Sequence, residues 1–403
     1  MSQDQLAAFE FDVVVVGGGG HVGLPLAIAF ADRGLRVAIY DVNEAAVKTV
    51  LAGHLPFREE GAQEALRQAL DAGLLHATTD PEVVSTSEHV VVVVGTPIDE
   101  HLNPNPHIVL HAFDAFRHHL RRGQLLVLRS TVYPGVTDWL ERQLRSHGID
   151  IDVAFCPERI AEGKAMQELF SLPQIVSART TAVRARAGSL FKHLTASIVE
   201  LEPEEAELAK LFTNSWRYIK FAAANQFYEV ANDHGLDYDR IRAAIAHDYP
   251  RAADVPGAGF AAGPCLFKDT MQLAAFADNS FLLGHSAMLV NEGLPLYLVS
   301  HLEKTYALGD MTVGILGMAF KAENDDIRSS LAYKLKRILQ FRAKEVLTTD
   351  PFVVVDDNLL PVDEVLERSD LLIVGAPHDQ YRALVIDKPV VDITNLLGRG
   401  TLV

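Results

Sequence analysis

The stretch GPCLFKD, residues 263–269, places a cysteine beside two ionisable side chains. The chain has only two cysteines in 403 residues, and this one, Cys265, follows the glycine-rich run PGAGFAAG. A free thiol most often behaves as a small buried hydrophobe. Glycine-rich backbone and Lys268, three residues later, favour instead an accessible thiol with a lowered pKa, which can act as a nucleophile. Cys156 ends the apolar run IDVAF and has no basic neighbour before Arg159, so we interpret it as structural.

A second candidate for chemistry is the glycine run near the N-terminus. Gly18, Gly20 and Gly23 form G-x-G-x-x-G between the apolar run FDVVVV and the helix-like segment VGLPLAIAFADRG. Backbone N–H groups in such a turn can approach a pyrophosphate, which the following helix N-terminus stabilises. Asp41 ends the next β-branched run, where a carboxylate can accept from ribose hydroxyls and repels a 2′-phosphate. The pattern predicts a dinucleotide site that prefers NAD to NADP, with a purely structural glycine turn as the alternative.

The elements that must position these residues follow a clear order along the chain. Over residues 1–203, short β-branched runs alternate with helical segments, which predicts a Rossmann-type parallel sheet with ligands at the carboxyl ends of its strands. Thr96 and Pro97, in VGTP, end one such run. We expect them to lie where the sheet meets the cofactor; the alternative is a turn that only ends the strand. Residues 204–308 read as a central helical domain, and strands return in a second, smaller α/β domain over residues 309–403.

The central segment opens with a predicted helix of almost thirty residues, beginning PEEAELAKLFTNSWRYIKFAAANQF. Lys210 and Asn214 stand four residues apart on it and therefore share one face. Apolar residues cover more than one stripe of this helix, and a monomer would expose many of them. We therefore expect a homodimer joined through this segment.

The composition narrows the class of protein. The formal net charge of −17 argues against a nucleic-acid partner, which requires a basic face. Two cysteines indicate a reducing, intracellular setting, so we expect the cytoplasm. No signal peptide is evident, and the apolar runs are far shorter than the ~20 residues that span a bilayer, so we expect no membrane partner. The sixteen histidines lack metal-ligand context, and we predict no metal.

Across nearly its whole length the chain resembles the UDP-glucose/GDP-mannose dehydrogenase family, the nucleotide-sugar 6-dehydrogenases. The motifs stand in the family's order: VVGGGGHVGLPLA, VGTP, RSTVYPG, CPERIAEGKA, ELAKLFTNSWRYIKFAAANQ, PGAGFAAGPCLFKD and LGMAFKAENDDIRSS. The resemblance implies an N-terminal NAD-binding domain, a central dimerisation domain and a C-terminal domain that binds a nucleotide-sugar, most simply a UDP-sugar. It also implies oxidation of the C6 hydroxyl to a carboxylate, with two NAD used in turn.

The resemblance implies roles residue by residue. Cys265 matches the catalytic cysteine, and Lys210 and Asn214 match the residues that face the reacting carbon. Thr131 and Asp269 match the residues that hold a catalytic water, and Glu158 matches the carboxylate assigned to thioester hydrolysis. Lys268 matches a lysine close to the cofactor, and the implied substrate contacts are Glu162, Gly257, Phe260 and Lys321.

Three departures from the family pattern leave the sugar open. The cysteine loop is one residue longer than the common PGPGFGGSC form, with AAGP in place of GGS. Phe267 replaces a proline often found between the cysteine and the lysine. CPER replaces the PEF of UDP-glucose enzymes and is closer to the branch that oxidises N-acetylated amino sugars.

The implied reaction explains why these residue types are needed. A four-electron oxidation passes through an aldehyde, which a thiolate can trap as a thiohemiacetal and carry to a thioester. Hydrolysis of the thioester then requires a base and a water. A lysine with an amide donor, such as Lys210 with Asn214, can stabilise the alkoxide that develops at each hydride step.

Two other functions remain open from the sequence. A two-electron hydroxyacid dehydrogenase can share the Rossmann start and a helical dimer domain, but it needs neither Cys265 nor a second α/β domain. An inactive nucleotide-sugar-binding protein is the other alternative. It is disfavoured because the set of catalytic residue types is intact, namely Cys265, Lys210, Asn214 and Asp269.

Replacing Asp41 with alanine should weaken NAD binding by roughly tenfold, because hydrogen bonds to a charged acceptor are lost. The same change should narrow the preference for NAD over NADP, since the carboxylate no longer repels a 2′-phosphate. Dissociation constants for both nucleotides, measured by calorimetry on parent and variant, check this. A parent enzyme that already prefers NADP would contradict it.

Overall fold

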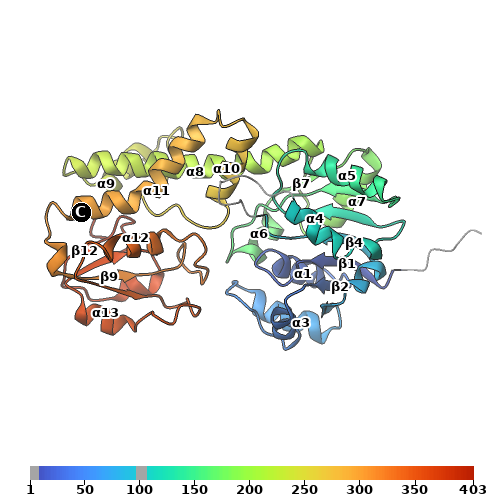
Figure 1. The fold of residues 1–403 in the computed structure, drawn as a ribbon, viewed down its shortest axis with the longest axis horizontal. Coiled ribbons are helices and arrows are strands. Elements are labelled where there is room, and N and C mark those ends of the chain that lie inside the picture. Colours follow the sequence, from blue (N-terminus) through green and yellow to red (C-terminus); the bar gives the residue numbers. More distant parts are fainter. Residues whose placement is uncertain (1–8, 97–106) are drawn as a thin grey trace, which may run out of the picture. The chain divides into compact units, whose positions relative to one another are not determined.

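The computed structural model describes residues 9–96 and 107–403, without the side chains of 107–110. The chain divides into an N-terminal unit, Met1–Leu211, and a C-terminal unit, Phe212–Val403 (Figure 1). Each unit contains one β-sheet with helices packed on it, which confirms the predicted α/β class. No helix of the described ranges is long and apolar enough to cross a membrane.

The N-terminal unit is built on an eight-stranded sheet in the order β3-β2-β1-β4-β5-β6-β7-β8. The described strand neighbours pair in parallel except β6 and β7, which meet antiparallel at one residue pair, Phe155 and Ser177. The expected parallel sheet is therefore confirmed with this one departure. The strands are β1 (Phe11–Val16), β2 (Val37–Tyr40), β3 (Leu75–Thr78), β4 (Ser87–Val92), β5 (Leu125–Leu128), β6 (Asp152–Phe155), β7 (Gln174–Ser177) and β8 (Ile198–Leu201).

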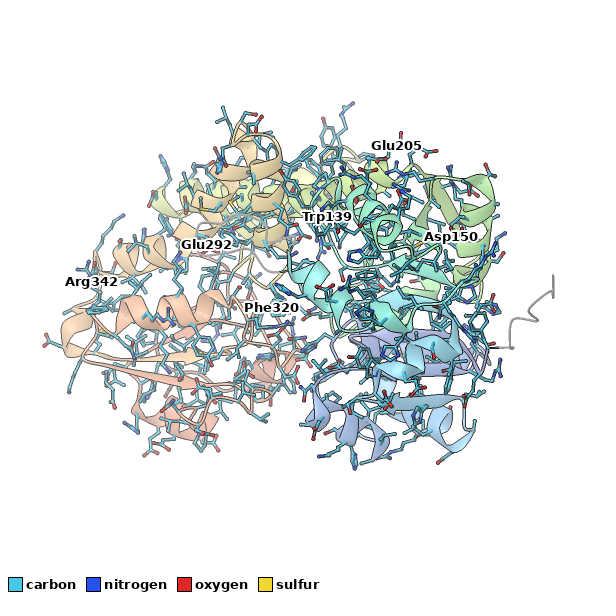
Figure 2. All side chains as sticks on the ribbon, turned by 45° about the vertical axis from the view of Figure 1, so that its right-hand side comes forward. Trp139, Asp150, Glu205, Glu292, Phe320 and Arg342 are labelled. Carbon is cyan, nitrogen blue, oxygen red and sulfur yellow. The ribbon has the colours of Figure 1, made fainter. Side chains whose placement is uncertain are left out.

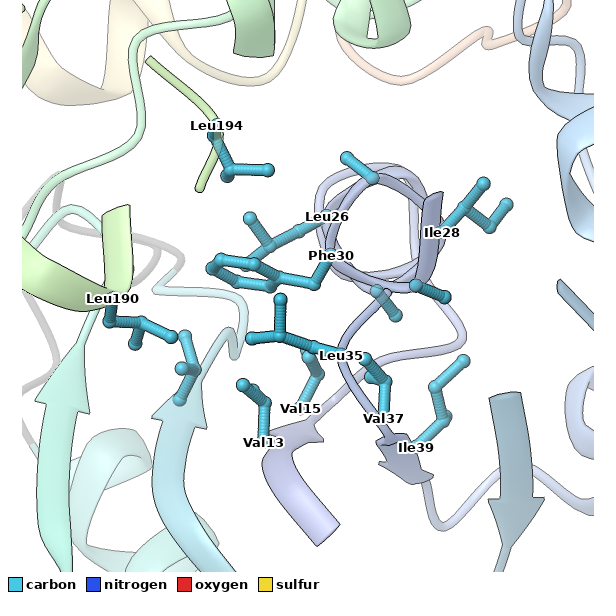
Figure 3. Packing of buried hydrophobic residues seen from close by; sticks show 14 of the residues in the cluster. Val13, Val15, Leu26, Ile28, Phe30, Leu35, Val37, Ile39, Leu190 and Leu194 are labelled. Atoms are coloured by element: carbon cyan, nitrogen blue, oxygen red, sulfur yellow. The ribbon is translucent and has the colours of Figure 1, made fainter. Parts of the chain in front are cut away.

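Strand β1 is apolar at consecutive positions because both of its faces are buried. Val13 and Val15 pack beneath helix α1 and its Phe30 (Figure 3), whereas Val14 and Val16 belong to the cluster on the opposite face. Successive side chains of a strand point to opposite faces, so a continuous apolar run is typical of a strand covered on both sides. The unit's helices are α1 (Gly23–Asp32), α2 (Glu44–Leu51), α3 (Ala62–Asp71), α4 (His107–Asp114), α5 (Val136–Ser146), α6 (Ala165–Ser171) and α7 (Thr181–Phe191).

The strand order reverses beside β1. From β1 the chain runs outward through β2 and β3, and it then returns to place β4 on the other side of β1. The loops after β1 and β4 therefore diverge at their carboxyl ends, which is where open α/β sheets bind their ligands.

Helix α8 (Pro203–Asp233) is one continuous helix of 31 residues and contains the boundary between the two units (Figure 1). Glu204 and Glu205 lie in its first turn, where acidic side chains complement the helix dipole. Gly235 follows its end with a φ of +68°, a left-handed conformation that suits a glycine. The long helix predicted from periodicity is thus confirmed.

The C-terminal unit combines the helical segment with a parallel four-stranded sheet in the order β10-β9-β11-β12. A single core joins Tyr228 of α8, Leu298 of α11, Ile315 of β9 and Leu335 of α12. Its strands are β9 (Thr312–Leu316), β10 (Glu345–Thr349), β11 (Leu371–Val374) and β12 (Val390–Val391). Its further helices are α9 (Tyr238–Ala246), α10 (Leu266–Phe276), α11 (Leu282–Leu302), α12 (Leu331–Leu339) and α13 (Val362–Arg368).

Candidate active site

The three motif glycines after β1 meet different surroundings. A Cβ atom at Gly18 would lie 2.8 Å from the Val15 carbonyl oxygen, and one at Gly23 would lie 2.5 Å from the Gly17 carbonyl oxygen. A Cβ atom at Gly20 would meet only the Gly17 oxygen, at 3.9 Å. Gly18 and Gly23 are therefore required by the fold itself, whereas Gly20 leaves backbone open to the close approach of a ligand. This arrangement fits the pyrophosphate of NAD.

Asp41 follows β2 and is bound to the same turn. Its Oδ2 accepts from the Gly19 N–H at 2.8 Å, and its Oδ1 accepts from the Asn43 N–H at 2.9 Å. An ionised carboxylate has about four acceptor positions, so each oxygen can accept once more. The carboxylate is thus held in place while it keeps capacity for two ribose hydroxyls.

The loops that follow β4 and β5 are tied together. The Thr96 hydroxyl donates to the Thr131 carbonyl at 2.6 Å, and the Ser130 hydroxyl accepts from the Val94 N–H at 2.7 Å. Thr96 and Thr131 therefore lie side by side at the carboxyl edge of the sheet. Pro97 lies outside the described residues.

The loop after Thr131 is anchored to the first turns of α8. Glu207 is buried and accepts from the Gly135 N–H at 2.7 Å, the Thr137 N–H at 2.9 Å and the Thr137 hydroxyl at 2.6 Å. Burial raises the pKa of the Glu207 carboxyl. Lys210 is buried one turn further along the same helix. Its place is therefore fixed relative to the loop that carries Thr131.

Glu158 lies just after β6 and is held by a buried arginine that the sequence did not single out. Its Oε2 pairs with Arg129, and its Oε1 accepts from the Arg159 N–H at 2.6 Å and the Ile160 N–H at 3.0 Å. Arg129 also donates to the Cys156 carbonyl at 3.1 Å and to Gln174 at 3.0 Å. The one available signal was a charged residue at the end of the buried run QLLVLR.

The chain around Glu162 is fixed by another residue that sequence reasoning missed. Glu59 is buried and accepts from the Gly163 N–H at 2.8 Å and from the Ala165 N–H at 2.7 Å, the latter in the first turn of α6. Glu162 itself is half-buried in the turn that these bonds close. The predicted carboxylates Glu158 and Glu162 thus share one rigidly held loop.

The two cysteines differ as expected. Cys156 is fully buried, and burial raises the pKa of its thiol to about 12. Cys265 is exposed and occupies the N-cap position of α10. The positive end of a helix dipole favours a thiolate over a thiol at such a position. The burial of Cys156 supports the structural interpretation of that residue.

Next to Cys265, a buried carboxylate joins two helices. Asp269, in the first turn of α10, is fully buried, and its Oδ1 lies 2.6 Å from the Lys268 ammonium nitrogen. The Asn214 side-chain amide of α8 donates to Asp269 Oδ2 at 2.5 Å. Four of the predicted residues, Asn214, Cys265, Lys268 and Asp269, are therefore together in the C-terminal unit.

The glycine-rich loop before Cys265 rests on a buried amide relay. Asn225 of α8 accepts from the Gly259 N–H at 2.9 Å and donates to Asn291 of α11 at 2.9 Å. Asn291 in turn donates to the Tyr218 carbonyl at 3.1 Å. Within the loop Gly257 is exposed, whereas Phe260 packs partly against the core.

The same loop lies against the segment that carries Lys321. Gly263 has a φ of +103°, and a Cβ atom there would lie 2.6 Å from the ring of Phe320, a residue labelled in Figure 2. The Lys321 ammonium nitrogen lies 5.4 Å from the centroid of that ring. The structure thus brings the cysteine loop and Lys321, far apart in the sequence, into one cluster.

The predicted site residues fall into two sets. The N-terminal unit holds the glycine turn, Asp41, Thr96, Thr131, Glu158, Glu162 and Lys210, and the C-terminal unit holds the others that the structure describes. Among the described residues, no group of three or more His, Cys, Asp or Glu side chains is arranged to hold a metal ion.

Comparison with family models finds one family in three successive ranges of the chain. Residues 12–195 match the NAD binding domain of the UDP-glucose/GDP-mannose dehydrogenase family, residues 204–292 its central domain, and residues 314–399 its UDP binding domain.

Relatives and solved structures agree with this match. The UDP-N-acetyl-D-mannosamine dehydrogenase of Pyrococcus horikoshii is 30% identical over 92% of this chain and 90% of its own length. The enzyme of the same name from Yersinia pestis is 29% identical over 93% of this chain and 96% of its own. The structure of a UDP-glucose dehydrogenase from Pyrobaculum islandicum covers 96% of this chain and 95% of its own, with a TM-score of 0.88 and 29% identity.

The glycine turn offers a matched pair of substitutions. Gly20→Ala should leave the thermal unfolding midpoint close to that of the parent, because its Cβ has room, but should weaken NAD binding about tenfold or more by keeping the ligand from the backbone. Gly23→Ala should lower the stability by about 1–3 kcal/mol, because its Cβ overlaps the Gly17 carbonyl. Calorimetric NAD titration and thermal unfolding of both variants measure this. Unchanged NAD affinity in Gly20→Ala would contradict the placement.

Proposed function

This chain belongs to the UDP-glucose/GDP-mannose dehydrogenase family, and we propose that it oxidises the C6 hydroxyl of a UDP-sugar to a carboxylate through a covalent intermediate on Cys265. It is an NAD-dependent oxidoreductase of nucleotide-sugars. The observation that carries the proposal is the exposed residue Cys265 at the N-cap of α10, one helical turn from the Asp269–Lys268 ion pair.

Among UDP-sugars, we propose an N-acetylated amino sugar, with UDP-N-acetyl-D-mannosamine as the first candidate. The names of the relatives from Yersinia pestis and Pyrococcus horikoshii support this choice, as does the CPER sequence around Glu158. The structural similarity to a UDP-glucose dehydrogenase keeps UDP-glucose as the second candidate. NADH production with UDP-glucose, UDP-N-acetylglucosamine, UDP-N-acetylmannosamine and GDP-mannose decides between them.

The proposed reaction consumes one alcohol, two NAD⁺ and one water, and it yields one carboxylate, two NADH and three protons. When bound, NAD accepts a hydride from C6 in each of two steps. Lys210 and the second amide N–H of Asn214 donate to the oxygen on C6 while its negative charge develops. The Cys265 thiolate adds to the aldehyde carbon, and the resulting thiohemiacetal becomes a thioester after the second hydride loss.

Hydrolysis of the thioester completes the proposed cycle. We assign the positioning of the water to Thr131 and Asp269, and assistance to its attack to Glu158. Water adds to the thioester carbonyl, and the carbon–sulfur bond breaks to return the Cys265 thiolate. The Asn214–Asp269 bond holds the amide in one orientation, so its other N–H is directed rather than free to rotate. Substrate contacts are proposed for Glu162, Gly257, Phe260 and Lys321.

The three domains take separate tasks in this proposal. Residues 1–203 bind NAD, and residues 309–403 bind the nucleotide-sugar. Residues 204–308 carry the cysteine, the dimer contacts and Lys268, which lies close to the cofactor. The matched ranges of the family's three domain models support this division. We place the enzyme in the cytoplasm, because a chain of 403 residues with only two cysteines suits a reducing compartment.

Two alternatives remain distinguishable by the number of NADH formed per substrate. A two-electron hydroxyacid dehydrogenase would form one NADH and would not need Cys265. An inactive nucleotide-sugar-binding protein would form none. The family match and the assembled Asn214, Lys268 and Asp269 around Cys265 favour the four-electron enzyme.

Cys265→Ser should abolish steady production of two NADH per sugar while leaving NAD and UDP-sugar binding intact, because neither depends on sulfur. A serine alkoxide forms far less readily than a thiolate, so the variant should stall or accumulate a covalent sugar adduct visible by intact mass. Lys210→Ala should instead lower the rate of both hydride transfers, because the group that stabilises the oxygen on C6 is lost in each.

Iodoacetamide provides the matched control for this experiment. It should label Cys265 in the native enzyme and reach the buried Cys156 only after denaturation, as peptide mapping would show. If Cys265→Ser formed two NADH per sugar at a nearly normal rate, the thiol would be structural and the mechanism wrong.

We also propose a homodimer formed through α8. One face of this helix carries Phe212, Trp216, Ile219, Ala223, Phe227 and Val230, all within about 80° of each other at 100° per residue. Trp216 and Phe227 are 58% and 53% exposed in the single chain. An apolar stripe of this length is typical of a helix that packs against a partner.

Light scattering at micromolar concentration should therefore give twice the mass of the chain. Trp216→Glu combined with Phe227→Glu should shift the mass toward that of one chain, since two charges would be buried in the interface. Exposed Asp357→Ser, outside the stripe, is the control and should leave the dimer unchanged. A parent that scatters as a monomer refutes the proposal.

A further inference from the structure

A buried histidine connects three parts of the C-terminal sheet. His378 follows β11, and its side chain is fully buried. Its Nδ1 lies 3.0 Å from the Glu323 N–H, and its Nε2 lies 3.0 Å from Asp350 Oδ2. A backbone N–H can only donate, so Nδ1 must accept and Nε2 must carry the proton that is shared with Asp350. The neutral imidazole is thus fixed in one tautomer and one orientation.

Asp350 occupies the place in this sheet that Asp41 occupies in the first. It follows β10, and its Oδ2 accepts from the Met318 and Ala319 N–H groups of the turn after β9 at 2.6 and 2.9 Å. Its Oδ1 accepts from the N–H groups of Phe352 and Val353. With His378 this makes five donors, more than the about four acceptor positions of a carboxylate. Asp350 has no capacity left for a ribose, and it serves to fasten the turn.

The segment from Gly317 to Asp326 is clamped at Glu323. This residue has a φ of +54°, which is a left-handed backbone conformation. The conformation is unfavourable for any residue other than glycine, and it persists only where the surrounding contacts hold it. Its N–H donates to His378, and its carboxylate accepts from the Asp379 N–H at 2.9 Å. Two consecutive residues after β11 therefore hold Glu323 by its backbone and by its side chain.

The clamped segment carries Phe320, which meets the cysteine loop, and Lys321, to which the proposed function assigns a substrate contact. Phe320 lies against Gly263, two residues before Cys265, and Lys321 follows it. We propose that His378 is a positioning residue for the nucleotide-sugar, because it fixes this segment so that Lys321 contacts the nucleotide and Phe320 supports the cysteine loop. This inference rests on the proposed function, which assigns the substrate contact to Lys321.

Two substitutions separate the two bonds of the histidine. In His378→Asn the amide oxygen can take the place of Nδ1 and accept from Glu323, while the bond to Asp350 is lost. In His378→Gln the amide nitrogen can take the place of Nε2 and donate to Asp350, while the Glu323 N–H loses its acceptor. Asp350 keeps its four backbone donors in both variants. The matched pair therefore tests the clamp rather than the carboxylate.

The expected result is a change in KM for one substrate only. His378→Gln should raise the KM for UDP-N-acetylmannosamine, and the calorimetric Kd for UDP alone, by about tenfold, while the KM for NAD stays within about twofold. His378→Asn should stay within about threefold of the parent in every constant. The circular dichroism spectrum and the thermal midpoint verify that both variants fold. A KM for NAD raised as much as that for the sugar nucleotide, or two folded variants equal to the parent, overturns the proposal.

Other outcomes are equally decisive. A raised KM for UDP-N-acetylmannosamine in His378→Asn, with an unchanged KM in His378→Gln, would assign the change in KM to the bond with Asp350. That result would overturn the proposal. Should His378→Gln fail to fold, Phe320→Leu takes its place and should speed the alkylation of Cys265 by iodoacetamide, because the loop loses the ring that supports it. An unchanged alkylation rate in Phe320→Leu then overturns the proposal. If the parent forms no NADH with any UDP-sugar, the proposed function is wrong. The Kd for UDP, measured by calorimetry, still tests whether His378 positions the nucleotide-binding segment.

Discussion

The fully buried carboxylate of Asp269 sits between the Lys268 ammonium group and the Asn214 amide, and it couples helix α10 to helix α8. A charge in this position is tolerated only while its partners remain, and removal of one partner from a buried pair costs about 3–5 kcal/mol. The two helices therefore cannot slide or rotate against each other without breaking the ion pair or the amide bond. Cys265 at the start of α10 and Asn214 on α8 keep a fixed relation for the same reason.

The two α/β halves use the same strand-end carboxylate for different purposes. Asp41 accepts one backbone N–H on each oxygen and keeps room for a ribose, beside a glycine turn that leaves Gly20 open. Asp350 is saturated by four backbone N–H groups and His378, and the corresponding turn carries Met318 and Ala319. One half is thus built to receive a dinucleotide, and the other holds its own turn rigid.

Local pattern accounts for what the sequence predicted well. The glycine spacing with Asp41, the β-branched runs of the strands and the periodicity of α8 all depend on neighbours within one or two elements. The partners that fix the site depend on pairings over long distances in the chain. Arg129 with Glu158, Asn214 with Asp269 and Asn225 with Asn291 join residues 29, 55 and 66 positions apart. A single sequence shows such residues only as isolated polar side chains.

The acidity of the chain does not oppose the binding of anionic nucleotides. A net charge of −17 is the sum over the whole molecule, whereas Asp269 is neutralised by Lys268 and Glu158 by Arg129. Exposed carboxylates further than about 8 Å away are largely screened at physiological salt. At the two proposed ligand sites, the backbone N–H groups of the Gly20 turn and of the α10 N-terminus present partial positive charge. The local field at these two places is therefore set by helix ends and paired charges rather than by the net charge of the whole molecule.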